Sequence, residues 1–229
     1  MKITPTRNGL RFTQHGVVIS ELRTTPGPTH SVFDVIAALI ALLAPRGRVA
    51  VLGFAGGGMM APLHALGVTV SLDCVDLDRE SYEVFRRHCP AWAAGIRWHH
   101  AEATAWLHRQ RAPFDLILDD LTVSEKGDIV KPTVSWTILP NRIPHHLRTG
   151  GFSFANLLLP PSGRWQPELG RLVAIHPSAR IVNFDDFENR ILIGGESLPS
   201  ARALGGRLRE SLRAIGSRQA RRIQLEGMG

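Results

Sequence analysis

The residues best suited to chemistry follow the first predicted strand, over 48–54. The chain turns there through Gly53-Phe54-Ala55-Gly56-Gly57-Gly58. Residues without bulky side chains let the backbone approach a ligand closely and adopt positive φ angles. The helix predicted next would direct free N–H groups and its positive dipole end at an anionic group. Read as G-x-A-x-G, the turn is typical of sites for S-adenosylmethionine-type cofactors. Read as G-x-A-x-x-G, it is typical of sites for a dinucleotide. The third interpretation is a tight turn that binds no ligand. The predicted cofactor-binding residues here are Gly53, Ala55, Gly56, Gly57 and Gly58.

Acidic residues end the next two predicted strands. The strand over 68–76 ends in Asp76 and Leu77, and a carboxylate at this point can accept hydrogen bonds from ribose hydroxyls, which both cofactor types carry. The strand over 96–100 is followed by Glu102 and Ala103. Glu102 could reach an adenine amino group or simply cap the following helix. We predict that these four residues contact the cofactor, with a solvated acid at the strand end as the alternative for Asp76.

The fourth predicted strand, over 114–120, ends in the pair Asp119 and Asp120. Adjacent acids at the carboxyl end of a central strand lie where strand order reverses in an open sheet, the usual ligand crevice. Because side chains alternate along a strand, only one of the pair should face the ligand. We predict Asp120 as the catalytic base and Asp119 as a cofactor-binding residue, with turn-forming acids in water as the alternative.

Three further residues are candidates for contact with a substrate. His30, just before the first predicted helix, is a second base or orienting group, or only a helix-start residue. Glu125 could reach a substrate from a loop past the fourth strand, and Trp136 could wall the pocket. We expect no metal site, because His99 and His100 would point to opposite faces of a strand.

The elements that must position these residues alternate between strand and helix. Helices are predicted over 30–43, 59–66, 79–88 and 103–111, each beside one of the four strands. Strict alternation implies a parallel sheet with helices on both faces. A fifth strand over 152–158, a helix over 165–175 and a hairpin over 181–193 follow. We therefore expect an α/β fold: a doubly wound, Rossmann-like, mostly parallel sheet with a C-terminal antiparallel hairpin and a small N-terminal β-hairpin.

Length and composition restrict the class of protein. The chain has 229 residues, 44% of them apolar, and two cysteines without a CxxC pair, which argues against a disulfide scaffold or a structural zinc site. The longest apolar run, over 35–44, is about half the ~20 residues of a membrane helix. The first residues lack the apolar core of a signal peptide. We expect a cytoplasmic protein with no membrane partner, organised as an N-terminal extension (1–29), a cofactor-binding catalytic domain (30–196) and a basic C-terminal tail (197–229).

Positive charge is concentrated in that tail. From residue 201 onward, the sequence has seven arginines and two glutamates. The net charge of this segment is therefore +5, out of +7 for the whole chain. Nucleic-acid binding by the body of the protein is therefore not expected. We prefer a solvated helix or one that packs in an oligomer such as a homodimer. An arm that contacts nucleic acid, an anionic membrane or an acidic protein is the alternative.

Taken together, these motifs resemble a known family. Residues 48–60, 76–78, 101–103 and 114–120 resemble, in order and spacing, the spermidine synthase-like (polyamine aminopropyltransferase-related) branch of the class I S-adenosylmethionine-dependent methyltransferase fold. The likeness spans about 12–195. It implies that Gly53 to Gly58 hold the methionine part of the cofactor, Asp76 the ribose, Glu102 and Ala103 the adenine edge, and that Asp120 is the catalytic aspartate.

The departures from that family concern the polyamine. Gly56 replaces the acid of the family's Gly-Gly-Gly-Asp-Gly-Gly motif, and Val123 replaces a second aspartate. Ile19 and Val32 stand where the family has a glutamine and a tyrosine that grip the polyamine. Burying the two charges of a diamine without carboxylate partners is expensive. The cofactor half of the site is thus retained while the diamine half is dismantled.

We therefore expect a transferase that uses S-adenosylmethionine or its decarboxylated form. Methyl transfer to a small amine or hydroxyl acceptor is preferred. Aminopropyl transfer to a non-classical amine is the first alternative. A binding protein that has lost turnover and an NAD(P)-dependent oxidoreductase are the others.

Overall fold

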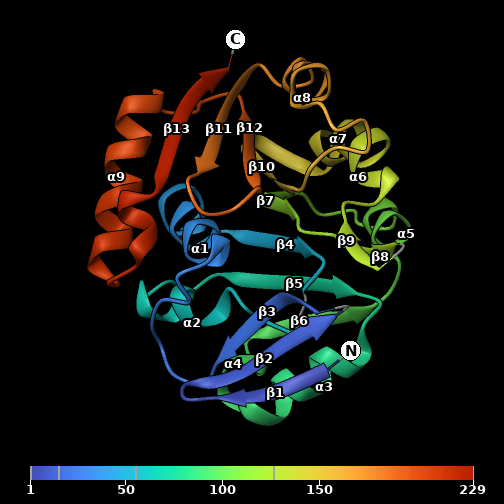
Figure 1. The fold of residues 1–229 in the computed structure, drawn as a ribbon. Coiled ribbons are helices and arrows are strands. Elements are labelled where there is room, and N and C mark those ends of the chain that lie inside the picture. Colours follow the sequence, from blue (N-terminus) through green and yellow to red (C-terminus); the bar gives the residue numbers. More distant parts are fainter. Residues whose placement is uncertain (1, 15, 55, 126, 229) are drawn as a thin grey trace.

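The computed structural model describes residues 2–14, 16–54, 56–125 and 127–228. Its centre is an eight-stranded sheet in the order β13-β11-β12-β10-β7-β4-β5-β6 (Figure 1). The strands are β4 (Arg48–Leu52), β5 (Ser71–Asp76), β6 (Ile96–His100), β7 (Phe114–Asp119), β10 (Leu147–Leu157), β11 (Ser178–Phe184), β12 (Arg190–Gly195) and β13 (Ile223–Met228). Strands β10, β7, β4, β5 and β6 pair in parallel, and β12, β11 and β13 continue the sheet by antiparallel pairing. The strand order reverses between β4 and β7, as in a doubly wound sheet.

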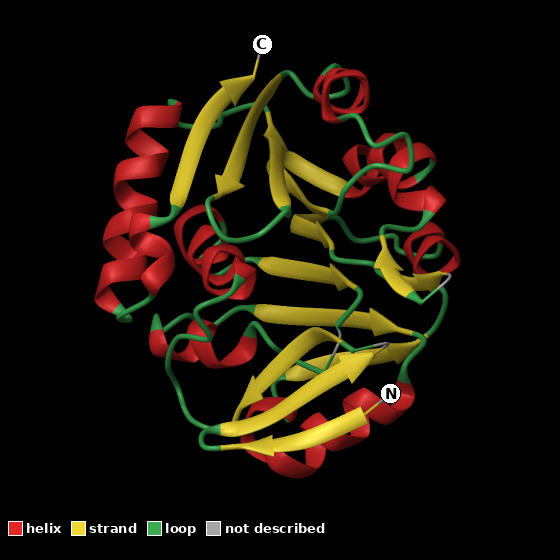
Figure 2. Cartoon of the chain, viewed as in Figure 1, coloured by secondary structure: helices red, strands yellow, loops and turns green. Residues whose placement is uncertain are grey.

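Helices cover both faces of this sheet (Figure 2). Alternation along β4 shows the two faces directly: Val49 and Val51 belong to one hydrophobic cluster, and Ala50 and Leu52 to another. The first cluster includes residues of α1 (Val32–Leu43), α2 (Met60–Ala65), α3 (Arg79–His88), α4 (Pro90–Ala93) and α9 (Ala201–Ala214). The second includes α5 (Ala103–His108), α7 (Leu139–Arg142) and the 3₁₀ turn η1 (Ile143–His146). A third cluster joins α6 (Thr133–Thr137) to α8 (Trp165–Val173).

Two small sheets lie outside the main one. The N-terminal sheet has three antiparallel strands, β1 (Lys2–Thr6), β2 (Gly9–Gln14) and β3 (Val17–Arg23). We expected only the hairpin that β2 and β3 form; β1 adds an edge strand, where Pro5 is tolerated. Phe12 of β2 is fully buried in the main core, so this sheet packs on the α/β layers. The other is a ribbon of β8 (Val123–Glu125) and β9 (Asp128–Val130).

The C-terminal segment is integrated with the sheet, where we expected a separate tail over 197–229. Leu204, Leu208 and Leu212 recur every four residues along α9 and are fully buried, and α9 packs on α1. This spacing forms one apolar helix face, whose burial stabilises the helix despite Gly205 and Gly206. After η2 (Arg218–Arg221), β13 pairs with β11 along its whole length.

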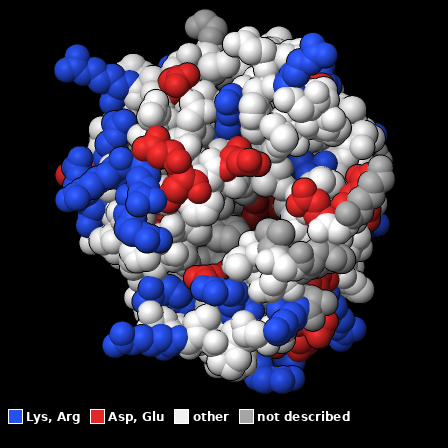
Figure 3. All heavy atoms as spheres, in the orientation of Figure 1, with Lys and Arg blue, Asp and Glu red and all other residues white. Residues whose placement is uncertain are grey.

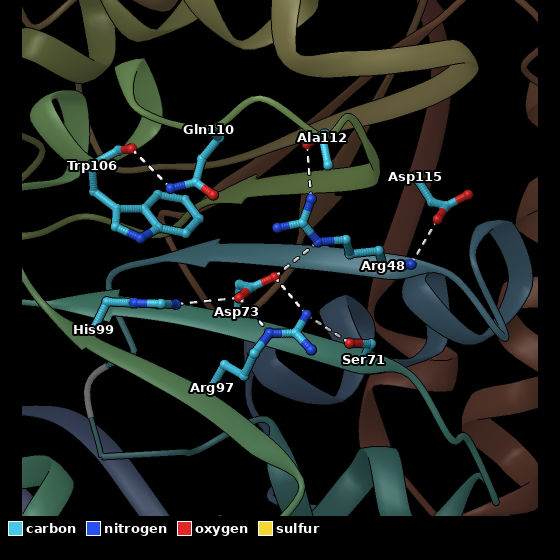
Figure 4. Close-up of polar contacts among 9 residues, drawn as sticks. All are labelled: Arg48, Ser71, Asp73, Arg97, His99, Trp106, Gln110, Ala112 and Asp115. Carbon is cyan, nitrogen blue, oxygen red and sulfur yellow. Dashed lines mark hydrogen bonds and ion pairs between the residues drawn. The ribbon is translucent and has the colours of Figure 1, made fainter.

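A charge cluster joins β4, β5 and β6 away from their carboxyl ends (Figure 4). The buried Asp73 of β5 accepts hydrogen bonds from Arg48 Nε (3.1 Å) and Arg97 Nε (2.8 Å) and lies 3.2 Å from His99 Nε2. Burial alone would raise the pKa of Asp73, but these partners lower it to about 2. The cluster therefore ties three parallel strands together through one carboxylate.

No helix in the part of the chain that the structure describes is long and apolar enough to cross a bilayer.

Candidate functional site

The glycine turn after β4 brings two strand ends together. Gly53, Gly56 and Gly57 have φ angles of +89°, +74° and +85°, in the left-handed region that favours glycine. A Cβ atom on Gly53 would lie 2.6 Å from the carbonyl oxygen of Asp120. Only glycine therefore lets this turn approach the end of β7 so closely. Ala55, the remaining member of the predicted motif, lies outside the described residues.

The other glycines of the turn are packed against protein. A Cβ on Gly56 would lie 3.0 Å from the ring of Phe12, and one on Gly57 would lie 2.7 Å from the ring of Phe85. A Cβ on Gly58 would meet Ser20 Oγ at 2.7 Å. The Cβ side of each glycine thus faces the core, and a ligand at this edge would meet the backbone of the turn.

Asp76 and Leu77 lie at the carboxyl end of β5, at the same edge of the main sheet as the glycine turn. The Asp76 carboxylate accepts hydrogen bonds from the backbone N–H of Phe54 (2.7 Å) and of Asp78 (2.8 Å). It therefore fixes the end of β5 to the glycine turn. The side chain of Leu77 is 66% exposed, and its carbonyl oxygen lies 3.1 Å from His100 Nε2. An exposed leucine beside a carboxylate offers an apolar surface next to a polar anchor.

Glu102 caps α5. Its carboxylate accepts hydrogen bonds from Thr104 N (2.9 Å), Thr104 Oγ1 (2.6 Å) and Ala105 N (2.7 Å). Burial alone would raise the pKa of Glu102, but these hydrogen bonds lower it. The capping alternative for Glu102 accounts for all of these contacts. Ala103, at the start of the helix, is buried beneath it.

Asp119 belongs to a buried ion pair. Its Oδ1 accepts hydrogen bonds from Lys131 Nζ (2.8 Å) and Ser135 Oγ (3.0 Å), and from the backbone N–H of Leu121 (3.1 Å). The Lys131 and Asp119 side chains are 0% and 2% exposed. Lys131 also donates to the carbonyl oxygen of Asp119. These donors hold the segment after β7 in place, and the predicted contact between Asp119 and a cofactor stays a prediction.

Asp120 differs from its neighbour in its environment. It is buried, and its Oδ1 accepts a hydrogen bond from Asn156 Nδ2 at 2.7 Å. Asn156 Oδ1 in turn accepts from Asn189 Nδ2 at 3.0 Å, which fixes the orientation of the amide. Burial raises the pKa of Asp120 to about 7, against the opposing influence of Lys131 and Asn156. A carboxyl group with this pKa can exchange a proton near neutral pH.

The molecule has a hollow on the face drawn in Figure 3. In Figure 3 the hollow lies near the ends of β4 and β7, and acidic atoms lie at its bottom. In open α/β sheets, ligands bind at the carboxyl ends of the strands, where the strand order reverses. The glycine turn, Asp76 and Asp120 all belong to this edge.

The three predicted substrate residues belong to different segments of the fold. His30 has a φ of +61°; its Nδ1 accepts from Arg218 N (3.3 Å) and its carbonyl oxygen from Gln219 Nε2 (3.0 Å), so it is tied to η2. Glu125 lies on the exposed ribbon of β8 and β9. Trp136 is buried in the cluster beneath α8. Among the described residues, neither His30 nor Trp136 hydrogen-bonds to Asp120, and the substrate roles of all three stay predictions.

Sequence reasoning missed Lys131, Asn156 and Asn189. Asn156 lies near the carboxyl end of the fifth predicted strand, so its place in the fold could have identified it. Asn189 follows in the loop between β11 and β12. Lys131 gives no such signal, because its burial depends on how the segment after β9 folds back onto Asp119. No group of His, Cys, Asp and Glu within residues 2–14, 16–54, 56–125 and 127–228 could hold a metal ion.

Solved structures share this architecture. A probable spermidine synthase from Corynebacterium glutamicum superposes with a TM-score of 0.76 at 16% identity, over 99% of this chain and 86% of that one. The chain therefore shares the fold of this probable spermidine synthase. A spermidine synthase in complex with the transition-state analogue AdoDATO gives a TM-score of 0.63 at 13% identity, over 93% and 73% of the two chains. Human methyltransferase-like protein 13 in complex with SAH gives 0.59 at 19%, over 84% and 92%. The sequence itself matches no family model and no curated protein.

Proposed function

We propose that this protein transfers a methyl group from S-adenosylmethionine to a small amine or hydroxyl acceptor, with Asp120 as the base. The observation that carries the proposal is the state of Asp120: a buried carboxyl group with a pKa of about 7, in backbone contact range of a glycine turn at the sheet's carboxyl edge. Perturbed carboxyl groups in such positions are typical of catalytic sites.

The described residues fit an adenosyl cofactor at this edge. The backbone of Gly53 and Gly56–Gly58 would approach the methionine part, and Asp76 would accept hydrogen bonds from the ribose hydroxyls. The exposed Leu77 side chain offers a surface for the adenine ring. When bound, the cofactor supplies a carbon activated by a sulfonium, which makes that carbon susceptible to displacement.

Asp120 would orient the acceptor and take its proton. The acceptor nitrogen or oxygen forms the new bond to carbon while the carbon–sulfur bond breaks, and the electron pair of that bond leaves on a neutral thioether. The acceptor's proton moves to the Asp120 carboxylate, whose raised pKa suits it to hold a proton near neutral pH. Asn156 holds one oxygen of the carboxylate in place, so the other can face the acceptor.

Aminopropyl transfer is the second candidate, because the fold resembles that of a probable spermidine synthase. Two observations favour methyl transfer to a neutral acceptor over transfer to a diamine. Asp119 is neutralised by Lys131 and has no free charge for a second ammonium group. Val123, which stands where the family has an aspartate, is an exposed apolar side chain.

Product analysis distinguishes these candidates. Purified protein is incubated with a panel of small amines and hydroxyl compounds and either S-adenosylmethionine or its decarboxylated form, and the thioether released is identified by mass spectrometry. S-Adenosylhomocysteine would indicate methyl transfer, and methylthioadenosine aminopropyl transfer. The variant Asp120→Asn should lose turnover, while Asp115→Asn, at the far end of the same strand, should retain it. No thioether with any acceptor, despite cofactor binding, would contradict a catalytic role.

A further inference from the structure

The outer side of α9 and η2 carries a set of unpaired arginines. Figure 3 shows basic side chains gathered on the side of the molecule that α9 covers in Figure 1. Five exposed arginines of this segment form no ion pair with any described residue. We call this set the arginine face: Arg202, Arg207, Arg213, Arg218 and Arg221. Glu210 is the one acidic residue of α9, and Asp186 beside η2 is paired with Arg222, so positive charge predominates on this face.

The opposite side of α9 is already occupied. Leu204, Leu208 and Leu212 are fully buried in the main core, so the helix has no apolar stripe left to pack against another chain. Two copies of the arginine face would repel each other, because like charges at short range raise the energy of association. The face is therefore not suited to homodimer formation.

The composition of the segment also argues against a lipid surface or unpaired nucleic acid. The described residues that expose a large apolar side chain all precede residue 201, whereas membrane-surface helices insert apolar side chains between the lipids. Residues 201–229 contain no Phe, Trp or Tyr, and proteins that bind single strands usually stack bases on aromatic rings. What remains is a charged surface without insertion or stacking groups.

We propose that the arginine face binds double-stranded nucleic acid through its phosphate backbone, without reading the base sequence. Guanidinium groups pair with phosphate oxygens in bidentate fashion, which suits arginine to this contact. Arg202 and Arg213 are eleven positions apart on α9, or about 16 Å along a helix. Arg218 and Arg221 of η2, which packs against α9, add two guanidinium groups to the face.

The number of arginines sets the expected dependence on salt. Five phosphate contacts on a duplex predict a slope of about −4.5 for log K against log salt concentration. A fourfold rise in salt should then weaken binding about 500-fold. Removal of two arginines should make the slope shallower by about 1.8.

The test measures the fluorescence anisotropy of a labelled 20-base-pair duplex from 50 to 200 mM NaCl. The full chain is compared with Arg207→Gln/Arg213→Gln and with Arg109→Gln/Arg111→Gln. The second pair removes the same charge from exposed positions at and beyond the end of α5, across the molecule from α9 in Figure 1. Thermal melting of all three proteins establishes that each is folded.

We expect the α9 variant to lose at least tenfold in affinity at 50 mM NaCl, with a shallower slope, and the α5 variant to bind like the wild type. Equal losses in both variants would show general charge attraction and overturn the proposal. Tighter binding of the matched single strand, or binding to phosphatidylserine vesicles in place of the duplex, would overturn it as well.

Discussion

Replacement of Asp120 by asparagine should stabilise the protein at neutral and alkaline pH. The folded state raises the pKa of Asp120 from 3.8 to about 7, so the folded protein holds this proton more tightly than the unfolded chain. The contribution of the group to stability is therefore fully present below pH 3.8 and is lost as the pH rises to about 7. Asparagine does not ionise, so the variant lacks this loss.

The magnitude follows from the size of the pKa difference. A difference of about three pKa units corresponds to about 4 kcal/mol, at 1.36 kcal/mol per unit. The variant should thus gain about 4 kcal/mol over the wild type between pH 4 and pH 8. The asparagine side-chain oxygen can still accept the hydrogen bond that Asn156 donates to Asp120, so packing around the site changes little.

Urea denaturation at a series of pH values measures this difference. The free energy of unfolding is determined for the wild type, Asp120→Asn and the control Asp115→Asn from pH 4 to pH 8. Only Asp120→Asn should show a gain that grows with pH. If the difference in free energy of unfolding between Asp120→Asn and the wild type stays constant across this range, the argument is refuted. The argument states that ionisation of the buried Asp120 carboxyl group destabilises the folded protein.

Two more predictions concern hydrogen-bonded carboxylates. The change Asn156→Ala removes a hydrogen bond that lowers the pKa of Asp120, so the acid limb of the pH–rate profile should move above about 7. The control Asn183→Ala, on β11, should leave the acid limb in place. A downward move of the acid limb in Asn156→Ala would contradict the assignment of this limb to Asp120. The change Asp73→Asn should cost about 2 kcal/mol at pH 6, because hydrogen bonds from Arg97 and His99 and the charges of Arg97 and Arg48 lower the pKa of Asp73 from 3.8 to about 2. That contribution is present above pH 3.8 and is lost as the pH falls towards 2, so the stability gap between variant and wild type should close over this range in acid denaturation. A gap that stays open at pH 2 would show that it has another cause.

The main sheet could be predicted because its signals are local. Short apolar strands such as Arg48–Leu52, separated by helical periods, identify a parallel sheet, and residues at the strand ends then share one edge. The pattern therefore predicts that Asp76 and Asp120 lie at the same edge. It also leaves the capping of α5 by Glu102 open as an alternative.

The parts that could not be predicted depend on contacts between distant segments. Nothing local to Lys131 indicates that it is buried against Asp119. The arginines of α9 favour a solvated helix from sequence alone, whereas Leu204, Leu208 and Leu212 decide its position by packing into the core. Antiparallel pairing of β13 with β11 joins residues 39 to 49 positions apart, and no short-range pattern specifies such a pair.

Calorimetric titration with S-adenosylmethionine tests most directly whether the carboxyl edge of the sheet holds an adenosyl cofactor. We predict saturable binding by the wild type and a loss of about 1–3 kcal/mol of binding free energy in Asp76→Ala, the cost of one strong hydrogen-bond partner. Asp185→Ala, on the loop after β11, should bind like the wild type. Absence of binding by the wild type, or binding of NAD(P) in its place, would contradict the account.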